Sequence, residues 1–271
     1  LEDVLEVCRV EQPDGVIVQF GGQTPLKIAE ALSKRGVKIL GTQPESIAAA
    51  EDREKFGAVM RKLDIPHPPY GIARTYAEAA ESANRVGYPV LVRPSFVLGG
   101  RAMEIVYDDR GLQRYLREEV SEVTPEHPVL VDRYIEDAFE FDVDVVSDGE
   151  RTIICGIMQH IEEAGVHSGD SACVLPPYVL PDAQRERMVA IARALAMELG
   201  VVGLMNIQFA YRDDDLYVLE VNPRASRTIP FVSKATGVNW VRVATRAMVG
   251  RTLVDQGVTE ELSPPHYAVK E

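Results

Sequence analysis

A strand that mixes apolar and polar side chains constrains the fold of this chain more than any other feature. Residues 218–228 read VLEVNPRASRT, in which Glu220 and Asn222 interrupt an apolar run and Arg224 and Arg227 follow it. Burying a neutral polar group without a partner costs about 2–7 kcal/mol, and burying a charge costs more. The fold must therefore bring partners to this segment, either from the protein itself or from a ligand.

The rest of the sequence predicts an α+β fold with antiparallel sheets and helices, preceded by a small α/β unit with a parallel sheet. Near the start, GVIVQF (15–20) and VKILG (37–41) predict two strands on either side of a helix that Gly36 can end. A strand, a helix and a strand in so short a span predict a parallel pair with a crossover helix.

Two hairpins and a long helix are predicted in the second half of the chain. Residues 140–158 alternate in polarity like an antiparallel hairpin that turns at Asp148 and Gly149, and residues 204–222 predict a second hairpin that turns at 213–215. Between the hairpins, the apolar side chains after Asp182 share one helical face, with Asp182 as the cap and Gly200 as the end.

Composition argues against several classes of function. The formal net charge is −13, whereas a surface that binds the nucleic-acid backbone needs a surplus of Lys and Arg, so we expect no nucleic-acid partner. No apolar run approaches the ~20 residues that span a bilayer, so we expect no membrane partner. Three distant cysteines, Cys8, Cys155 and Cys173, predict reduced thiols in a cytoplasmic protein. The chain begins without Met inside a helical pattern and without a signal-peptide pattern, so we expect that it was cut from a longer one.

Oxygen donors are predicted to gather on the second hairpin. Because side chains alternate along a strand, Glu220 and Asn222 are expected on the same face as Leu216 and Val218, with Gln208 of the neighbouring strand within reach. One carboxylate and two or three amide oxygens are hard ligands. Mg²⁺ takes such ligands when substrate phosphates and water supply the others.

Cations follow the same strand directly. Arg224 and Arg227 lie just past Pro223, and the guanidinium group is always charged and forked, which suits phosphate. A metal and arginines at one strand end would neutralise a phosphoryl group during its transfer. A structural ion pair between Glu220 and Arg224 is the simpler interpretation, and this strand alone leaves it open.

Two loops favour the ligand interpretation. VRPSFVLGGRAMEI (92–105) places a loop after Arg93 whose backbone amides can close over phosphates, although one glycine pair is also typical of a plain hairpin loop. GVHSGDSAC (165–173) is a second loop with the composition of a ligand contact. Zinc bound by His160, His167 and Cys173 is an alternative, but the spacing matches no standard zinc site.

Taken in order, these segments closely resemble the ATP-grasp ligases, and among them the large subunit of carbamoyl phosphate synthetase. VIVQFGGQTPLKIAEAL, VRPSFVLGGRAMEIVY, GVHSGDSACVLP, GLMNIQFA, LEVNPRASRTIPFVSKATGV and GVTEE match that family nearly end to end. The family's large subunit carries two related ATP-grasp halves, and the form EAGVHSGDSAC resembles the second half, in which carbamate is phosphorylated. The resemblance covers that half only.

The resemblance implies an ATP-grasp fold in three parts. Together with the proline-rich connector PHPPYG at 66–71, it implies a pre-ATP-grasp α/β unit at 1–68 that is truncated at its N-terminus. A small subdomain with the Gly-rich phosphate loop would follow at 69–145, and a large subdomain with the metal and phosphoryl-transfer site at 146–271.

The resemblance also implies a site, residue by residue. Gln208, Glu220 and Asn222 would bind Mg²⁺ or Mn²⁺, with two ions, and Glu220, Arg224 and Arg227 would be catalytic. The residues implied to contact the nucleotide are Arg93, Gly99, Gly100, Arg133, Ile135, Glu140, Gly165, Val166, His167, Ser168, Gln208 and Glu220.

The activity that the resemblance implies is ATP-dependent phosphorylation of carbamate to carbamoyl phosphate, in arginine and pyrimidine biosynthesis. ATP and carbamate would be the substrates. The first synthetase half of the same subunit and a glutamine amidotransferase small subunit would be the protein partners, and without them the chain could lack activity.

Two alternatives stay open. One is another ATP-grasp ligase, which makes an acyl phosphate from a larger carboxylate. The other is a nucleotide-binding regulatory module without catalysis, which predicts missing metal ligands, whereas Gln208, Glu220 and Asn222 are all present.

Overall fold

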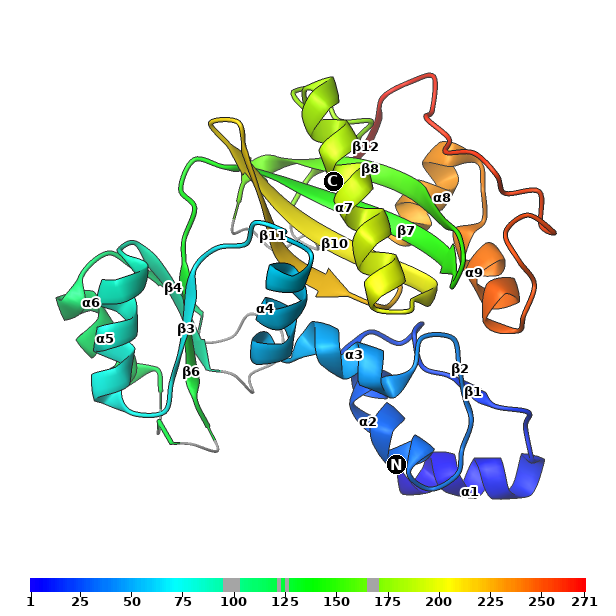
Figure 1. The fold of residues 1–271 in the computed structure, drawn as a ribbon, viewed down its shortest axis with the longest axis horizontal. Helices are drawn as coiled ribbons and strands as arrows, with labels where there is room; N and C mark the ends of the chain where they lie inside the picture. The colour runs from blue at the N-terminus through cyan, green and yellow to red at the C-terminus, as the bar shows by residue number, and fades with distance from the viewer. Residues whose placement is uncertain (95–102, 121–122, 125–126, 165–170) are drawn as a thin grey trace. The chain divides into compact units, whose positions relative to one another are not determined.

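A computed structural model of the chain describes residues 1–94, 103–120, 123–124, 127–164 and 171–271 (Figure 1). The described residues form two compact units. The larger unit comprises Leu1–Pro66 and Phe139–Glu271, and the smaller unit comprises His67–Ala138. The boundaries of the compact units therefore lie at other residues than the boundaries of the three functional parts that the sequence suggests, and those functional parts stay a proposal.

The larger unit begins with the small α/β part that the sequence predicts. Its two strands pair in parallel, as the strand–helix–strand pattern requires. The apolar face of the connecting helix, with Leu26, Ala29 and Leu32, is buried against Ile39 and Ile47. The elements here are α1 (Glu2–Glu11), β1 (Val16–Ile17), α2 (Gln23–Ser33), β2 (Ile39–Leu40), α3 (Pro44–Glu51) and α4 (Arg53–Lys62).

A six-stranded antiparallel sheet forms the rest of the larger unit, with strand order β11-β10-β7-β8-β9-β12. Both predicted hairpins are present. The first hairpin turns at Asp148 and Gly149. The second turns at Asp213 and Asp214, whose φ values both lie in the left-handed region, and Asp215 already begins β11. The strands are β7 (Phe139–Asp148), β8 (Thr152–Glu163), β9 (Cys173–Leu175), β10 (Val202–Arg212), β11 (Asp215–Asn222) and β12 (Ala268–Lys270).

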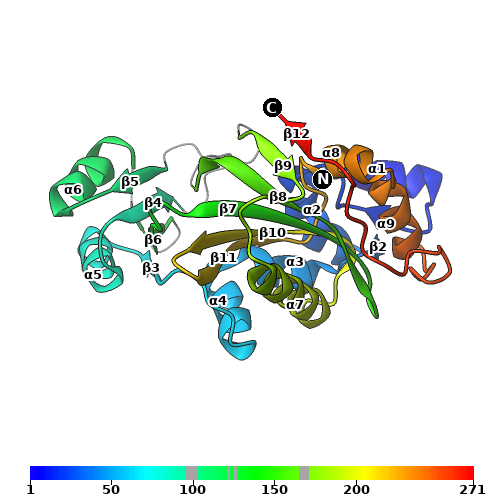
Figure 2. The ribbon, with the colours of Figure 1, turned by 90° about the horizontal axis from the view of Figure 1, so that it is seen from above.

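Helices cover both faces of this sheet. Helix α7 (Asp182–Glu198) packs Met188, Ile191 and Leu195 against Ile207 and Phe209 of β10, in a core to which α4 also contributes. Helices α8 (Ile229–Thr236) and α9 (Trp240–Met248) lie on the other face, in a second core centred on the fully buried Trp240. Figure 2 shows α7 and α4 on one side of these strands and α8 on the other.

The long helix differs from its prediction at one end. Pro181 precedes its first turn and Asp182 lies inside that turn without capping it through its side chain. An acidic residue in the first turn still interacts favourably with the helix dipole. The helix therefore begins one residue earlier than a cap at Asp182 would place it.

The smaller unit is a four-stranded antiparallel sheet with strand order β3-β6-β4-β5 and two helices. Thr75 and Asp108 cap the helices through their side chains, accepting hydrogen bonds from the amides of Glu78 and Gly111. Its elements are β3 (Tyr70–Ala73), α5 (Tyr76–Val86), β4 (Val90–Pro94), β5 (Glu104–Val106), α6 (Asp109–Glu118) and β6 (Val129–Arg133).

Two findings bear on the predictions from composition. Cys8, Cys155 and Cys173 are free thiols, as predicted. Within the described residues, no helix combines the length and the hydrophobicity that crossing a bilayer requires.

Candidate functional site

The predicted oxygen donors lie on one face of the hairpin formed by β10 and β11. Gln208 pairs directly with Glu220, and Asn206 pairs with Asn222 two residues further along. Paired residues of antiparallel strands point to the same face, with Cβ atoms about 4.5–5.5 Å apart. The strand register therefore brings Gln208, Glu220 and Asn222 together, whereas their role as metal ligands stays a proposal.

One prediction about that face is wrong. Simple alternation places Leu216 and Val218 on the face of Glu220, but Val218 pairs with Phe209 while Glu220 pairs with Gln208. One extra residue on β11 therefore forms a β-bulge. Because of this bulge, Leu216 and Val218 lie in the apolar core, and Glu220 is exposed on the opposite face.

Gln208 and Glu220 present oxygen atoms that no described residue satisfies. In the part of the chain that the structure describes, neither side chain makes a hydrogen bond or an ion pair. Gln208 is half-buried, Glu220 is exposed and Asn222 is buried. Neighbouring carboxylate and amide oxygens of this kind fit a hard divalent cation such as Mg²⁺, with phosphate oxygens or water completing its coordination.

The turn after β11 presents the two predicted arginines. The guanidinium of Arg224 donates to Asn222 Oδ1 and to the carbonyl oxygen of Ala225, both at 3.2 Å. Its Nε is buried and has no hydrogen-bond partner among the described residues. Arg227 is exposed. These two bonds use two of the five N–H donors of the guanidinium, and Nε is among the donors that no described residue satisfies.

Three carboxylates favour the charged form of Arg224. Burial lowers the pKa of Arg224, and the charges of Glu220, Glu51 and Asp144 oppose this effect. Burial also raises the pKa of Glu51, and Glu220 contributes in the same direction, while Arg224 lowers it. Glu51, at the end of α3, was not identified from the sequence, because nothing in its local pattern connects that helix with β11.

Sequence reasoning also missed a buried polar network beside this face. Asp142 Oδ2 lies 2.8 Å from His160 Nε2, and Asp142 Oδ1 accepts a hydrogen bond from Asn206 Nδ2 at 3.1 Å. Asn206 donates equally to Asp144 Oδ1, at 3.0 Å. Asp142, Asp144 and His160 are each 1% exposed, so these contacts replace solvation almost completely.

The network shifts the proton affinities of its members. Burial by itself lowers the pKa of His160, but the hydrogen bond to Asp142, the thiol of Cys173 and the charge of Glu140 raise it to about 10. Burial and the charge of Asp142 raise the pKa of Asp144 to about 6, against the hydrogen bonds that it accepts. These contacts favour the protonated imidazole of His160, with Nε2 donating to Asp142.

The other predicted contacts are distributed over both units. Glu140, on β7 of the larger unit, is buried, and its carboxylate lies 3.9 Å from His160 Nδ1. In the smaller unit, Arg93 Nε lies 3.9 Å from Asp132 Oδ2, and Arg133 donates to the carbonyl oxygen of Tyr88. Ile135 is half-buried. The predicted residues outside the described part of the chain are Gly99, Gly100, Gly165, Val166, His167 and Ser168.

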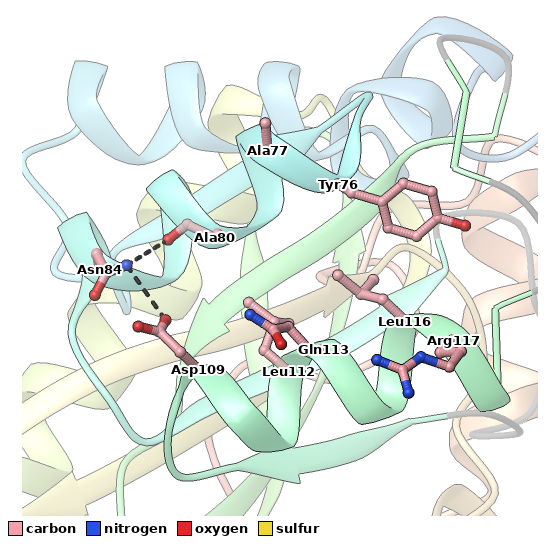
Figure 3. Close-up of a pocket in the computed structure, with 9 residues that line it drawn as sticks. All are labelled: Tyr76, Ala77, Ala80, Asn84, Asp109, Leu112, Gln113, Leu116 and Arg117. Carbon is pink, nitrogen blue, oxygen red and sulfur yellow. Dashed lines mark hydrogen bonds between the residues drawn. The ribbon is translucent and has the colours of Figure 1, made fainter.

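Besides the β10–β11 hairpin, cavities and possible metal-binding clusters are other candidates for a functional site. A cavity of about 580 Å³ lies between α5 and α6 in the smaller unit, lined by Tyr76, Leu112 and Arg117 among others, and no predicted residue lines it (Figure 3). Among the residues with described positions, no three His, Cys, Asp or Glu side chains are placed to hold a metal ion. The oxygen donors of the β10–β11 hairpin include only one carboxylate, so they are not such a cluster.

Two family models together match nearly the whole chain. The carbamoyl-phosphate synthase L chain ATP-binding domain matches residues 52–256, and the carbamoyl phosphate synthase preATP-grasp domain matches residues 1–49. The junction between the two matches falls just before α4.

Similar sequences support the same family. The carbamoyl phosphate synthase large chain of Vibrio cholerae is 56% identical over 271 residues, which is all of this chain and 25% of the relative. That of Methanothermobacter thermautotrophicus is 58% identical over 274 residues, covering 100% of this chain and 26% of the relative. The chain therefore spans about a quarter of the length of the curated relatives it matches.

Solved structures show the fold at low sequence identity. The biotin carboxylase domain of Hydrogenobacter thermophilus 2-oxoglutarate carboxylase, solved with MgADP, ADP and bicarbonate, has a TM-score of 0.82 and 22% identity, covering 99% of this chain and 60% of that one. Biotin carboxylase from Campylobacter jejuni has a TM-score of 0.81 and 19% identity, covering 99% and 61%. The chain thus has the ATP-grasp fold, with a small parallel two-stranded sheet at its start.

Proposed function

Because the chain belongs to the family of carbamoyl phosphate synthase large chains and contains its ATP-binding domain, we propose that it phosphorylates carbamate with ATP. It would do so as the second synthetase half of a large chain, and the product would be carbamoyl phosphate. The observation that carries this proposal is the direct pairing of Gln208 with Glu220 next to Arg224, where neither oxygen donor nor Arg224 Nε has a side-chain partner among the described residues.

The metal site we propose uses three residues. Gln208 and Glu220 would hold Mg²⁺ or Mn²⁺ from neighbouring strands, and Asn222 would add an oxygen beside them. Two ions would be bound together with the nucleotide. A bound divalent cation neutralises the charge of the transferring phosphoryl group and draws it into line with its acceptor.

The chain's own cations would act on the opposite side of the phosphoryl group. Arg224 is held by Asn222 and Ala225, so its other N–H donors, Nε among them, would be directed without a further loss of side-chain entropy. Arg227 is exposed on the same turn and would add a second positive charge. No side chain needs to be modified covalently, since alignment and charge neutralisation can supply the rate enhancement.

The nucleotide contacts we propose are those that the family resemblance implies. Arg93, Arg133 and Ile135 would contact ATP, and Glu140 would bind the ribose hydroxyls. Gly99 and Gly100 are proposed as contacts of the triphosphate, and Gly165, Val166, His167 and Ser168 as contacts of the nucleotide. The MgADP bound to the related biotin carboxylase domain supports ATP and Mg²⁺ as the ligands of this fold.

The proposed partners are those that the family resemblance implies. The chain matches about a quarter of each relative, so the rest of a large chain, including the first synthetase half, would complete it, and a glutamine-hydrolysing small subunit would join that large chain. They would supply carbamate and ammonia for arginine and pyrimidine biosynthesis in the cytoplasm. Another ATP-grasp carboxylate ligase is the second candidate, and family membership makes it the weaker one.

ATP formation from ADP and carbamoyl phosphate tests the proposal in the complete enzyme. We expect Glu220→Ala to lower this rate on the order of 100-fold or more, because one metal ligand of the transition state is lost. Asp215→Ala is the matched control, since it removes an exposed carboxylate from the other end of β11. An unchanged rate in the Glu220 variant would refute the metal role. If ADP formation depended on a larger carboxylic acid, the second candidate would replace the first.

A further inference from the structure

The turn that presents Arg224 and Arg227 is attached to two parts of the chain that are distant in sequence. Residues 223–228, here called the arginine turn, follow β11 without regular secondary structure apart from local bends. An irregular segment keeps its side chains in place only when other groups fix its backbone. The contacts of this turn are therefore decisive for where the guanidinium groups lie.

Gln19 holds the first half of the arginine turn. Its side-chain Nε2 donates to the main-chain carbonyl oxygen of Pro223 at 2.8 Å. The main-chain carbonyl oxygen of Gln19 accepts a hydrogen bond from the amide of Ala225 at 3.0 Å. Gln19 is 0% exposed although it follows the short strand β1. These two bonds fix the backbone on both sides of Arg224.

The space for Gln19 is provided by two glycines. A Cβ at Gly203 would lie 2.3 Å from Gln19 Oε1, and a Cβ at Gly41 would lie 3.1 Å from it. Both glycines have left-handed φ values, +112° and +99°, which side chains rarely adopt. Thr42 completes the site, since its hydroxyl accepts the other hydrogen of Gln19 Nε2 at 2.8 Å. Three separate segments thus shape the environment of one buried amide.

Asp144 holds the second half of the arginine turn from β7. Its Oδ2 accepts hydrogen bonds from Ser226 Oγ at 3.0 Å and from Thr228 Oγ1 at 3.1 Å. Ser226 Oγ also accepts from the amide of Ile229 at 3.0 Å, which fixes the start of α8. The carboxylate therefore holds the hydroxyl groups of the residues on both sides of Arg227.

We propose that Gln19 and Asp144 are positioning residues for phosphoryl transfer, which hold the arginine turn from two sides so that Arg224 and Arg227 face the transferring group. This inference rests on the proposed function. Neither residue would touch substrate or metal. Gln19 acts through the backbone of the turn and Asp144 through the hydroxyls of Ser226 and Thr228, and the metal ligands on β10 and β11 keep their strand register without them.

The expected kinetic effect is a loss in kcat rather than in nucleotide affinity. Displacing a charge-neutralising group by about 1 Å can cost on the order of 100-fold in rate. Because the proposed nucleotide contacts lie on other segments, KM for ADP should change less than about threefold. A variant that merely destabilises the protein would lower the melting temperature and leave kcat per folded enzyme unchanged.

The experiment measures ATP formation from ADP and carbamoyl phosphate in the complete enzyme, together with the melting temperature of each variant. Gln19→Met removes the donor to Pro223 while keeping a side chain of similar length. Thr42→Val is the matched control, because it removes the other bond of Gln19 Nε2 and leaves the bond to the turn. Thr228→Val tests the Asp144 side with a milder change, and decides the matter if the Gln19 variant fails to fold.

We expect kcat to fall between about tenfold and 100-fold in Gln19→Met and in Thr228→Val. The kcat of Thr42→Val should stay close to that of the unmodified enzyme, although its melting temperature falls about as much as that of the other two variants. Equal kcat in all three, or losses that follow the melting temperature in all three, would overturn the inference. Glu220→Ala separates the two hypotheses. If it retains activity, the proposed function fails, whereas an inactive Glu220 variant beside fully active turn variants rejects only the positioning role.

Discussion

Replacing the buried His160 tests the polar network most sharply, because its charge makes stability depend on pH. His160 donates to Asp142 at 2.8 Å and lies 3.9 Å from Glu140, with both carboxylates buried. These contacts raise the pKa of His160 from 6.5 to about 10. A folded-state pKa above the unfolded value adds stability that is fully present below pH 6.5 and is lost as pH rises toward 10. The full shift corresponds to about 5 kcal/mol at most.

The assay is urea unfolding of the unmodified chain and of His160→Gln at several pH values from 6.5 to 10. We expect the free energy of unfolding of the unmodified chain to fall by a few kcal/mol across this range relative to the variant. His266→Gln is the matched control, since His266 is exposed. The difference in the free energy of unfolding between His266→Gln and the unmodified chain should stay constant over this pH range. An imidazole of His160 that loses its proton near pH 6.5, as followed by NMR, would refute the reasoning.

Three further predictions concern stability. The free energy of unfolding of the unmodified chain, relative to that of Asp144→Asn, should fall by on the order of 2–3 kcal/mol as pH rises from about 4 to about 6, because the raised pKa favours the protonated carboxyl in the folded state. Calorimetry at several pH values measures this, and a free-energy difference that rises with pH would contradict it. Phe209→Ala should cost about 3–5 kcal/mol in urea unfolding, well above the half-exposed Phe139→Ala. Thr236→Val leaves Trp240 Nε1 without its 3.0 Å acceptor and should cost about 1–3 kcal/mol in the same assay, so an unchanged midpoint would count against it.

The secondary structure was predictable where local chemistry decides it. The turn at Asp148 and Gly149 and the long apolar face of α7 follow from turn propensity and helical periodicity, and both are present. The bulge in β11 was not predictable, because the same letters VLEV fit a regular strand. Only the partner strand, with Phe209 buried opposite Val218, determines which residue is the extra one.

The candidate site was predictable in its donors but not in its support. Glu220 and Arg224 stand out locally, because charges are unusual at the end of a buried strand. Asp142 and Asp144 alternate with apolar residues as an exposed polar face would, and their burial depends on His160, Asn206 and Thr228 from other elements. One signal existed, since acidic residues on a central strand of a sheet require buried partners. Gln19 gave no such signal, because a single amide beside a strand is common on protein surfaces.

The central claim is that Gln208 and Glu220 together bind a divalent cation beside Arg224. Anomalous diffraction from Mn²⁺, in crystals of the complete enzyme grown with ADP, locates such an ion directly. The account predicts a peak about 2.0–2.6 Å from oxygens of both side chains. A peak that lies away from both residues, or ADP bound with manganese on other ligands, would contradict it.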